Sequence, residues 1–438
     1  MKVLIVGGGA REHCIADKLK EDGAELFVSM NNLNPGLARI SSDILRAADT
    51  DMAKIVPWAG EKGIELAVIG PEAPLEKGMV DELEKVGIPA VGPHRTCARL
   101  ETSKSFTRNL LEKYKIPGNP KFRVFKSSDG LMDFIRELGE YVVKDEGLAG
   151  GKGVKLSGEH LKSIQEGYDY AVSCIQRSGA VVVEEKFVGE EFSLQCLTDG
   201  KTVVGSPLAQ DHKRAFEGDK GPNTGGMGSY SDANHLLPFL TRTDYDAAMD
   251  ITRKVCVAIG KDCGIPYRGV MYGGFIATKD GVRLVEYNAR FGDPETMNVI
   301  PLLETSLLDM FTAVIEGNLK ESMARCSKKA TVCKYVVPIG YGVKSEAGHP
   351  LHVDEAAIAR AGARLYYAAV DQRPEGLFTG TSRALGVVGI GETIREAEAK
   401  AEKALAHVKG HVCMRHDIGT PQAIHAKVER MKRIRGRI

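Results

Sequence analysis

The chain has 438 residues, a length that predicts about three domains and argues against a single small binding module. Hydrophobic residues make up 43% of the chain and charged residues 27%, which excludes a disordered or fibrous protein. Lysine and arginine (59) nearly balance aspartate and glutamate (58), so a nucleic-acid partner is not expected. Glycine is in excess, with 49 copies against a usual share of about 7%, and this indicates tight turns or close backbone approaches to a ligand.

The sequence offers no membrane or export signal. No apolar run reaches the roughly 18 residues of a membrane-spanning helix, and the apolar stretch at the start is too short for a signal peptide. The nine cysteines are scattered without a Cys-x-x-Cys pair, which is typical of reduced thiols. We therefore expect a cytoplasmic protein without a membrane partner. The basic segment 427–437 could contact phosphates, but the solvated end of a terminal helix is the simpler interpretation.

An alternating α/β pattern opens the chain. The apolar run 3–6 predicts a strand that ends at a glycine turn, and residues 11–20 have helical spacing. A second apolar run, 65–69, ends in the same way at Gly70 and Pro71. Residues 1–100 are therefore predicted to form a Rossmann-like domain with a parallel sheet, whose ligands bind beyond the carboxyl ends of the strands.

The first glycine turn does not match a dinucleotide-binding fingerprint. Glu12 stands where the third glycine should pack helix against strand, which disfavours a nicotinamide enzyme. Gly8 and Gly9 still place backbone N–H groups at a helix N-terminus beside Arg11, and this arrangement is typical of a phosphate site. A purely structural turn is the alternative.

Two further glycine-dense loops, 147–153 and 221–228, lie in the middle of the chain. The first follows a strand that ends at Lys144, which could reach a polyphosphate, but Gly153 replaces the hydroxyl residue of a Walker A loop. A loop that folds over phosphates and a solvated turn both remain open. The second loop follows the polar cluster 210–214 and could present backbone donors to a small anionic ligand.

The segment 283–290 carries the strongest local pattern. Glu286, Asn288 and Arg290 alternate, so they should share one strand face, with Leu284 one pair before them. Carboxylate and amide oxygens suit magnesium, and the arginine could stabilise charge on a transferring phosphoryl group. A polar strand face on which arginine pairs with glutamate is the structural alternative. The remaining residues, 327–438, are predicted to form an α+β domain with a helix over 392–408.

Taken together, eight segments resemble the phosphoribosylamine–glycine ligases, a family of the ATP-grasp superfamily; they are residues 7–13, 70–75, 101–106, 144–154, 184–191, 210–214, 221–228 and 286–296. The resemblance implies an α/β and α+β multidomain fold. The expected division is an N-terminal α/β domain, 1–100; an ATP-grasp body, 101–120 with 191–326; a small lid, 121–190; and a C-terminal α+β domain, 327–438.

The resemblance also implies the reaction. Members of the family join glycine to 5-phosphoribosylamine through glycyl phosphate, with ATP and Mg²⁺ or Mn²⁺, and form glycinamide ribonucleotide, ADP and phosphate in de novo purine (IMP) biosynthesis. We expect these small-molecule substrates, no nucleic acid, and a monomer or weak dimer. Another ATP-grasp carboxylate–amine ligase or carboxylase is the alternative. A non-catalytic nucleotide sensor is disfavoured by the intact set of Glu286, Asn288 and Arg290.

Site residues follow from the resemblance position by position. ATP is expected at Lys104, Lys144, Lys152, Glu185, Lys186, Phe187 and Glu191, and the metal at Glu286 and Asn288. Arg290, Asp293 and Lys144 are the expected catalytic residues. Other substrate contacts are expected at Gly8, Gly9, Arg11, Pro71, Glu72, Asp211, Lys213, Gly225, Gly226, Met227 and Arg383. The segment 31–36 departs from the family's shorter loop, so its contacts are not predicted.

Overall fold

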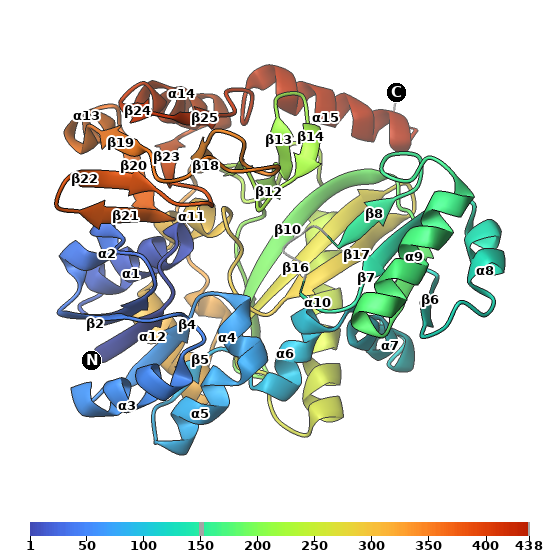
Figure 1. The fold of residues 1–438 in the computed structure, drawn as a ribbon, viewed down its shortest axis with the longest axis horizontal. Coiled ribbons are helices and arrows are strands. Elements are labelled where there is room, and N and C mark those ends of the chain that lie inside the picture. Colours follow the sequence, from blue (N-terminus) through green and yellow to red (C-terminus); the bar gives the residue numbers. More distant parts are fainter. Residues whose placement is uncertain (149–152, 437–438) are drawn as a thin grey trace.

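The computed structural model describes residues 1–148 and 153–436, and its first unit is a parallel sheet covered by helices (Figure 1). The strand order is β3-β2-β1-β4-β5, so the chain crosses from one side of β1 to the other between β3 and β4. The strands are β1 (Lys2–Val6), β2 (Glu25–Met30), β3 (Asp43–Arg46), β4 (Leu66–Ile69) and β5 (Ala90–Val91); the helices are α1 (Ala10–Glu21), α2 (Pro35–Ile40), α3 (Met52–Lys62), α4 (Glu72–Lys77) and α5 (Met79–Lys85). The predicted Rossmann-like sheet is confirmed, and its ligand edge contains the first glycine turn.

Two helices, α6 (Arg95–Thr102) and α7 (Lys104–Lys113), lead to a small antiparallel sheet with its own apolar core. Its strand order is β6-β9-β7-β8. The elements are β6 (Phe122–Phe125), α8 (Leu131–Leu138), β7 (Tyr141–Asp145), β8 (Val154–Leu156), α9 (Ile164–Ser178) and β9 (Val181–Glu185). Figure 1 shows this unit on the right, beside a larger central sheet.

The central sheet is also antiparallel, in the order β11-β10-β16-β17. The long helix α10 packs against it, starting from a capping box between Thr241 and Asp244 and ending at Gly264. Its elements are β10 (Gly189–Thr198), β11 (Val203–Gly205), α10 (Arg242–Cys263), β16 (Gly269–Thr278) and β17 (Gly281–Asn288). β17 holds the predicted metal ligands.

A third sheet joins strands from both sides of residue 327, in the order β12-β15-β18-β23-β20 with β25 on β18. Of the strands that precede residue 327, β12 contains the predicted substrate residue Asp211 and β15 directly follows Met227, so the C-terminal region pairs with the part of the chain that holds the predicted substrate site. The strands are β12 (Gln210–Asp211), β15 (Gly228–Ser231), β18 (Ala330–Pro338), β20 (Ala363–Tyr367), β23 (Leu385–Gly391) and β25 (Val412–Met414). The predicted helix over 392–408 is confirmed as α14 (Ile394–Leu405).

The remaining elements connect or cover these sheets. Two short sheets are β13-β14 and β21-β22-β19-β24. The elements are β13 (Arg214–Phe216), β14 (Lys220–Asn223), α11 (Thr296–Val299), η1 (Ile300–Leu302), α12 (Leu307–Glu316), η2 (Glu321–Met323), β19 (Pro350–Val353), α13 (Glu355–Arg360), β21 (Val370–Arg373), β22 (Gly376–Thr379), β24 (Val408–Gly410) and α15 (Pro421–Ile434). In the described part of the chain, no helix combines the length and apolar character needed to cross a membrane.

The basic end of the chain corrects one expectation. α15 forms as predicted, but its basic side chains are not simply solvated. Lys427 and Arg430 pair with Glu190 of β10 at 3.4 and 2.9 Å, and Arg435 pairs with Asp244 of α10 at 2.7 Å. The basic residues therefore fasten the last helix to the central sheet.

The segment 31–36, whose role the sequence left open, joins the first sheet to the C-terminal region. Asn34 is fully buried, and its side-chain amide donates to the carbonyls of Gly8 and Tyr367 at 2.9 and 2.8 Å. The Nδ2 of Asn32 donates to the Val370 carbonyl at 2.5 Å. These bonds fix the first glycine turn against β20 and β21.

His13 lies in the same interface and supports a prediction about acid stability. Its Nδ1 accepts a hydrogen bond from the Tyr367 N–H at 2.9 Å, and burial, aided by the charge of Arg39, lowers its pKa from 6.5 to about 4. Between pH 6.5 and pH 4 the imidazole of His13 binds a proton in the unfolded chain but not in the folded chain. The free energy of unfolding therefore falls as the pH falls through this range. We expect His13→Asn to remove about 2 kcal/mol of this acid sensitivity, measured by urea unfolding at pH 7 and pH 4.5. Equal pH dependence in both proteins would contradict the assignment.

Candidate functional site

The first glycine turn meets β4 around the side chain of Glu12. Its Oε2 accepts a hydrogen bond from the Gly9 N–H at 2.9 Å, and a Cβ on Gly70 would lie 2.0 Å from its Oε1. A Cβ on Gly9 would lie 2.5 Å from the Oε2 of Glu12, so the turn after β1 and the end of β4 both need glycine to admit this carboxylate. Arg11, itself buried, pairs with Glu12 at 2.6 Å and donates to the Phe291 carbonyl at 3.1 Å. The turn thus contacts the segment that follows the predicted metal strand.

Arg290 lies where the first sheet meets the central sheet. Its guanidinium contacts Glu72 of α4 at 3.3 Å, Glu101 of α6 at 3.0 Å and the Oδ1 of Asn288 at 3.2 Å. Glu101 is buried and also accepts from the Ala289 N–H at 2.7 Å. Arg290 is therefore held with two carboxylates and a predicted metal ligand around it, and the structural alternative of an Arg290–Glu286 pair is not what forms.

A bulge in β17 changes which residues share its faces. Gly274 of β16 pairs with Glu286, but the next residue, Phe275, pairs with Leu284, so Val285 is the extra residue. Phe275 also contacts Tyr287 ring to ring at 6.2 Å. Leu284 and Tyr287 therefore pack together in the core, and Leu284 does not share the face of Glu286 as expected. Glu286 and Asn288 remain partly exposed on the opposite face.

A buried ion cluster holds this bulge. Lys144 donates to the Val285 carbonyl at 2.8 Å and pairs with Glu184 at 2.6 Å. Arg108 binds Glu184 through two N–H groups at 2.7 and 2.9 Å and also donates to the Val285 carbonyl at 2.7 Å. Burial lowers the pKa of Lys144, and the carboxylates of Glu184 and Glu286 oppose that effect. The cluster joins the small sheet to the central sheet at the predicted nucleotide site.

The other predicted ATP residues line the seam between these two sheets. Lys104 donates to the Gly147 carbonyl at 2.7 Å, at the base of the glycine loop. Lys186 donates to the Ser157 carbonyl at 2.9 Å, and Glu185 accepts from the Lys121 N–H at 2.9 Å. Phe187 lies 5.8 Å below the guanidinium of Arg283. Lys152 is outside the described residues.

Glu191 connects the nucleotide residues to the substrate residues. It pairs with Lys213 at 2.8 Å, and this contact lowers the pKa of Glu191. Burial opposes a charge on Lys213, but Glu191 and Glu286 outweigh it and raise the pKa of this lysine. Lys213 therefore stays protonated between two carboxylates that were predicted to bind ATP and metal.

The second glycine loop is clamped by the C-terminal region. Arg383 pairs with Asp293 at 3.0 Å and donates to the carbonyls of Gly225 and Gly226. The Tyr335 hydroxyl donates to the other oxygen of Asp293 at 2.5 Å. Tyr335 was not predicted as a site residue, because its apolar strand 334–338 looked like ordinary core. Met227 is buried and uses its backbone to pair with His212 and Tyr335.

Asp211 offers an unsatisfied acceptor beside this loop. Its Oδ1 is buried and has no hydrogen-bond partner among the described residues. Burial raises the pKa of Asp211 well above its ordinary value, and the charge of Glu295 adds to the effect. A Cβ on Gly226 would lie 2.5 Å from the same oxygen, so the glycine keeps it open. The carboxylate is suited to a small cationic group that enters beside bare backbone.

Comparisons with known proteins cover nearly the whole chain. Three family models match it in order: phosphoribosylglycinamide synthetase N domain, residues 1–101; ATP-grasp (A) domain, residues 102–296; and C domain, residues 331–421. The chain belongs to the phosphoribosylglycinamide synthetase family.

Relatives in this family match along their full length. The phosphoribosylamine–glycine ligase of Methanothermobacter thermautotrophicus is 48% identical over 99% of this chain and 100% of its own. The ligase of Thermococcus gammatolerans is 49% identical over 99% and 98%. The resemblance inferred from eight segments is confirmed.

Solved structures agree with the family assignment. The crystal structure of phosphoribosylamine–glycine ligase from Thermotoga maritima has a TM-score of 0.80 at 27% identity, over 95% of this chain and 100% of that one. Biotin carboxylase from Campylobacter jejuni shares the fold, with a TM-score of 0.75 at 13% identity over 99% and 98% of the two chains. The predicted multidomain α/β fold of a phosphoribosylglycinamide synthetase is confirmed.

Proposed function

We propose that this protein joins glycine to 5-phosphoribosylamine at the expense of ATP and yields glycinamide ribonucleotide, ADP and phosphate for purine biosynthesis. The observation that carries the proposal is the position of Arg290, which contacts Glu72 of the first unit and Asn288 of the metal strand. A residue in this place can act on a group that passes from nucleotide to substrate. Full-length similarity to phosphoribosylamine–glycine ligases supports the same conclusion.

The proposed division of labour follows the domains predicted from the sequence. The lid, 121–190, has its own apolar core, and with the body it would enclose ATP between Lys104, Lys144 and the strand residues Glu185, Lys186 and Phe187. Lys152, on the glycine loop, would complete the phosphate contacts. The first domain, 1–100, would hold phosphoribosylamine at Gly8, Gly9, Arg11 and Pro71. The C-terminal domain, 327–438, would close the glycine site through Arg383.

A divalent metal fits the residues on the free face of β17. Glu286 and Asn288 offer carboxylate and amide oxygens, the donors that Mg²⁺ prefers together with phosphate oxygens and water. The charge of Glu286 also raises the pKa of Lys213, so this face attracts cations. When bound, the metal would neutralise phosphate charge; Mn²⁺ would suit the same donors. Related biotin carboxylase structures are described with bound MgADP or an ATP analogue, which supports nucleotide use on this fold.

The chemistry needs placement more than a covalent nucleophile. A carboxylate is a poor acyl donor until one oxygen leaves as phosphate, so an oxygen of glycine attacks the γ-phosphorus and ADP departs. The amine of phosphoribosylamine then attacks the acyl carbon, and phosphate leaves with that oxygen. Arg290 would stabilise the charge on the transferring group, and Asp211 would hold the ammonium of glycine.

The path of one oxygen atom tests this proposal. With [¹⁸O]glycine, ATP and phosphoribosylamine, we expect glycinamide ribonucleotide to form and one ¹⁸O to appear in inorganic phosphate. Label in AMP would show an acyl adenylate instead and contradict the glycyl phosphate route. Failure to form the ribonucleotide would overturn the proposed activity itself.

A matched pair of glycines tests the proposed glycine site. Gly226 and Gly281 have nearly equal φ values, +103° and +105°, but a Cβ on Gly226 would meet Asp211 and Pro294 whereas a Cβ on Gly281 meets nothing within 4 Å. We expect Gly226→Ala to lower kcat/KM for glycine about 10²-fold, because reacting groups shift by a fraction of an ångström. Gly281→Ala carries the same backbone penalty of about 1–2 kcal/mol, but it should leave kcat/KM for glycine unchanged. Equal losses in steady-state assays of the two variants would rule out a role for Gly226.

A further inference from the structure

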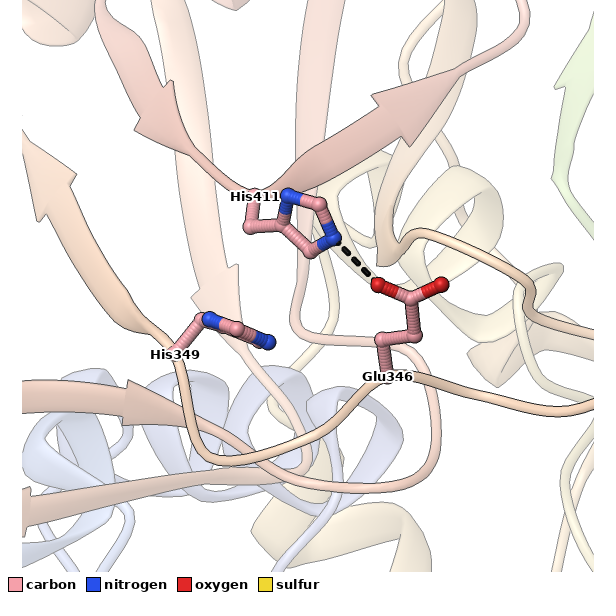
Figure 2. A group of neighbouring side chains, drawn as sticks. All are labelled: Glu346, His349 and His411. Atoms are coloured by element: carbon pink, nitrogen blue, oxygen red, sulfur yellow. Dashed lines mark hydrogen bonds and ion pairs between the residues drawn. The ribbon is translucent and has the colours of Figure 1, made fainter.

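Three side chains of types that can bind a metal lie close together in the C-terminal region: Glu346, His349 and His411 (Figure 2). Glu346 and His349 lie on the segment between β18 and β19, and His411 lies on the turn between β24 and β25. One ligand atom from each lies within 4.8 Å of the others. The Nε2 of His411 is 2.5 Å from a Glu346 oxygen, and the two imidazole rings are 4.5 Å apart.

Backbone hydrogen bonds hold all three residues in place. The N–H of Glu346 donates to the Ile339 carbonyl at 2.9 Å, and the N–H of Ile339 donates to the His411 carbonyl at 3.3 Å. His349 is paired with Thr379 of β22, whose N–H donates to the His349 carbonyl at 3.0 Å. These bonds hold the backbone of both segments that carry the donors and tie His349 to β22, so the three side chains start from fixed positions.

We propose that Glu346, His349 and His411 bind one divalent cation of the zinc class. Two imidazoles and one carboxylate, with water in the fourth position, form a common tetrahedral zinc set, whereas Mg²⁺ and Ca²⁺ prefer oxygen donors alone. Ligand bonds of about 2.0–2.1 Å place tetrahedral ligand atoms about 3.3 Å apart. The Glu346–His411 contact opens slightly and His349 turns inward to reach this spacing, which partly exposed side chains can do.

The cluster is better explained by a cation than by a surface ion pair. A pair of Glu346 with a protonated His411 uses only one imidazole, and it would place a second imidazole against a charged ring. A metal binds both rings in their neutral form and satisfies the carboxylate as well. The ion would join the β18–β19 segment to the β24–β25 turn. The same segment begins near Tyr341, whose hydroxyl accepts a hydrogen bond from the Gly225 N–H at 3.2 Å.

Zinc titration of the whole protein tests the site. Without nucleotide and with excess Mg²⁺ to fill the β17 site, we expect calorimetry to show one Zn²⁺ per chain. His349→Ala and His411→Ala should each weaken Zn²⁺ binding about tenfold or more, because even supporting residues of metal sites are worth that much. His352→Ala, which removes another exposed histidine of the same region, is the control and should bind as the parent does.

Two further measurements keep the result clear. Zn²⁺ should raise the melting temperature of the parent and of His352→Ala but not of the cluster variants, whose metal-free melting temperatures should match the parent's. Co²⁺ should give the visible spectrum of a tetrahedral site in the parent and in His352→Ala but not in His349→Ala or His411→Ala. Absence of Zn²⁺ binding in the parent, or equal affinity in His349→Ala and His411→Ala, would overturn the proposal.

Discussion

Glu286→Gln is expected to lower kcat by at least about 10²-fold while leaving the melting temperature unchanged. Glutamine fills the same space but cannot offer a charged oxygen to the divalent cation proposed at this face. The side chain is partly exposed on the open face of β17, so the substitution leaves no buried charge. Steady-state ADP release at several Mg²⁺ concentrations measures the effect, and the variant should need more Mg²⁺ than the parent.

The control for this variant removes a neighbouring carboxylate from the same hairpin. Asp280 lies in the exposed turn between β16 and β17, so Asp280→Asn changes the charge by the same amount without touching the proposed site. We expect parental kcat and Mg²⁺ dependence for it. If Glu286→Gln kept near-normal activity, or if Asp280→Asn lost as much, the metal assignment would be wrong.

Asp211→Asn is expected to raise the KM for glycine about 100-fold with little change in the KM for ATP. The unpartnered Oδ1 of Asp211 is the buried acceptor nearest Gly226, and truncating one partner of a buried charge pair costs about 2–5 kcal/mol. Asn keeps the shape and removes the charge. Initial rates at varied glycine and saturating ATP give both constants.

The pH dependence of glycine binding provides a second readout for Asp211. Because burial raises its pKa, protonation removes the negative charge at a higher pH than for an ordinary aspartate. The KM for glycine should therefore rise as pH falls in the parent and stay flat in Asp211→Asn. Asp232→Asn is the control, since burial also raises the pKa of Asp232 but its Oδ1 is occupied by the Ala233 N–H. The same rise in KM with Asp232→Asn would show that charge loss anywhere in this region is sufficient.

Local sequence patterns predicted the first sheet and several single elements. The apolar runs 3–6 and 65–69 each end at glycines and predict strands, and these two strands pair in parallel with their carboxyl ends at one edge of the sheet. Each run can be recognised without knowledge of distant contacts. α14 follows from its Ala, Glu and Lys composition in the same way. The pairing of Glu286 with Asn288 on one face also follows from alternation.

The bulge at Val285 shows where such reasoning fails. Strict alternation placed Leu284 with Glu286, but the carbonyl groups of this stretch bind Lys144 and Arg108, which are far away in the sequence. Those side chains are in turn fixed by Glu184. A two-residue period contains no information about such long-range contacts.

The contacts that hold the second glycine loop against the C-terminal region were only partly predictable, for the same reason. Arg383 and Asp293 could each be selected from their motifs. Their ion pair, and the hydrogen bond from the Tyr335 hydroxyl to Asp293, depend on β18 lying beside β15. Sequence motifs identify which residues carry chemistry, and tertiary packing decides which of them meet.

Release of ADP under four substrate conditions tests the central claim most directly. With ATP and Mg²⁺ present, we expect ADP to form only when glycine and phosphoribosylamine are both added, in equal amount to glycinamide ribonucleotide. Each substrate alone, and neither, should leave ATP intact. ADP formed with bicarbonate or another acid in place of glycine, or no ADP under any condition, would contradict the proposed ligase.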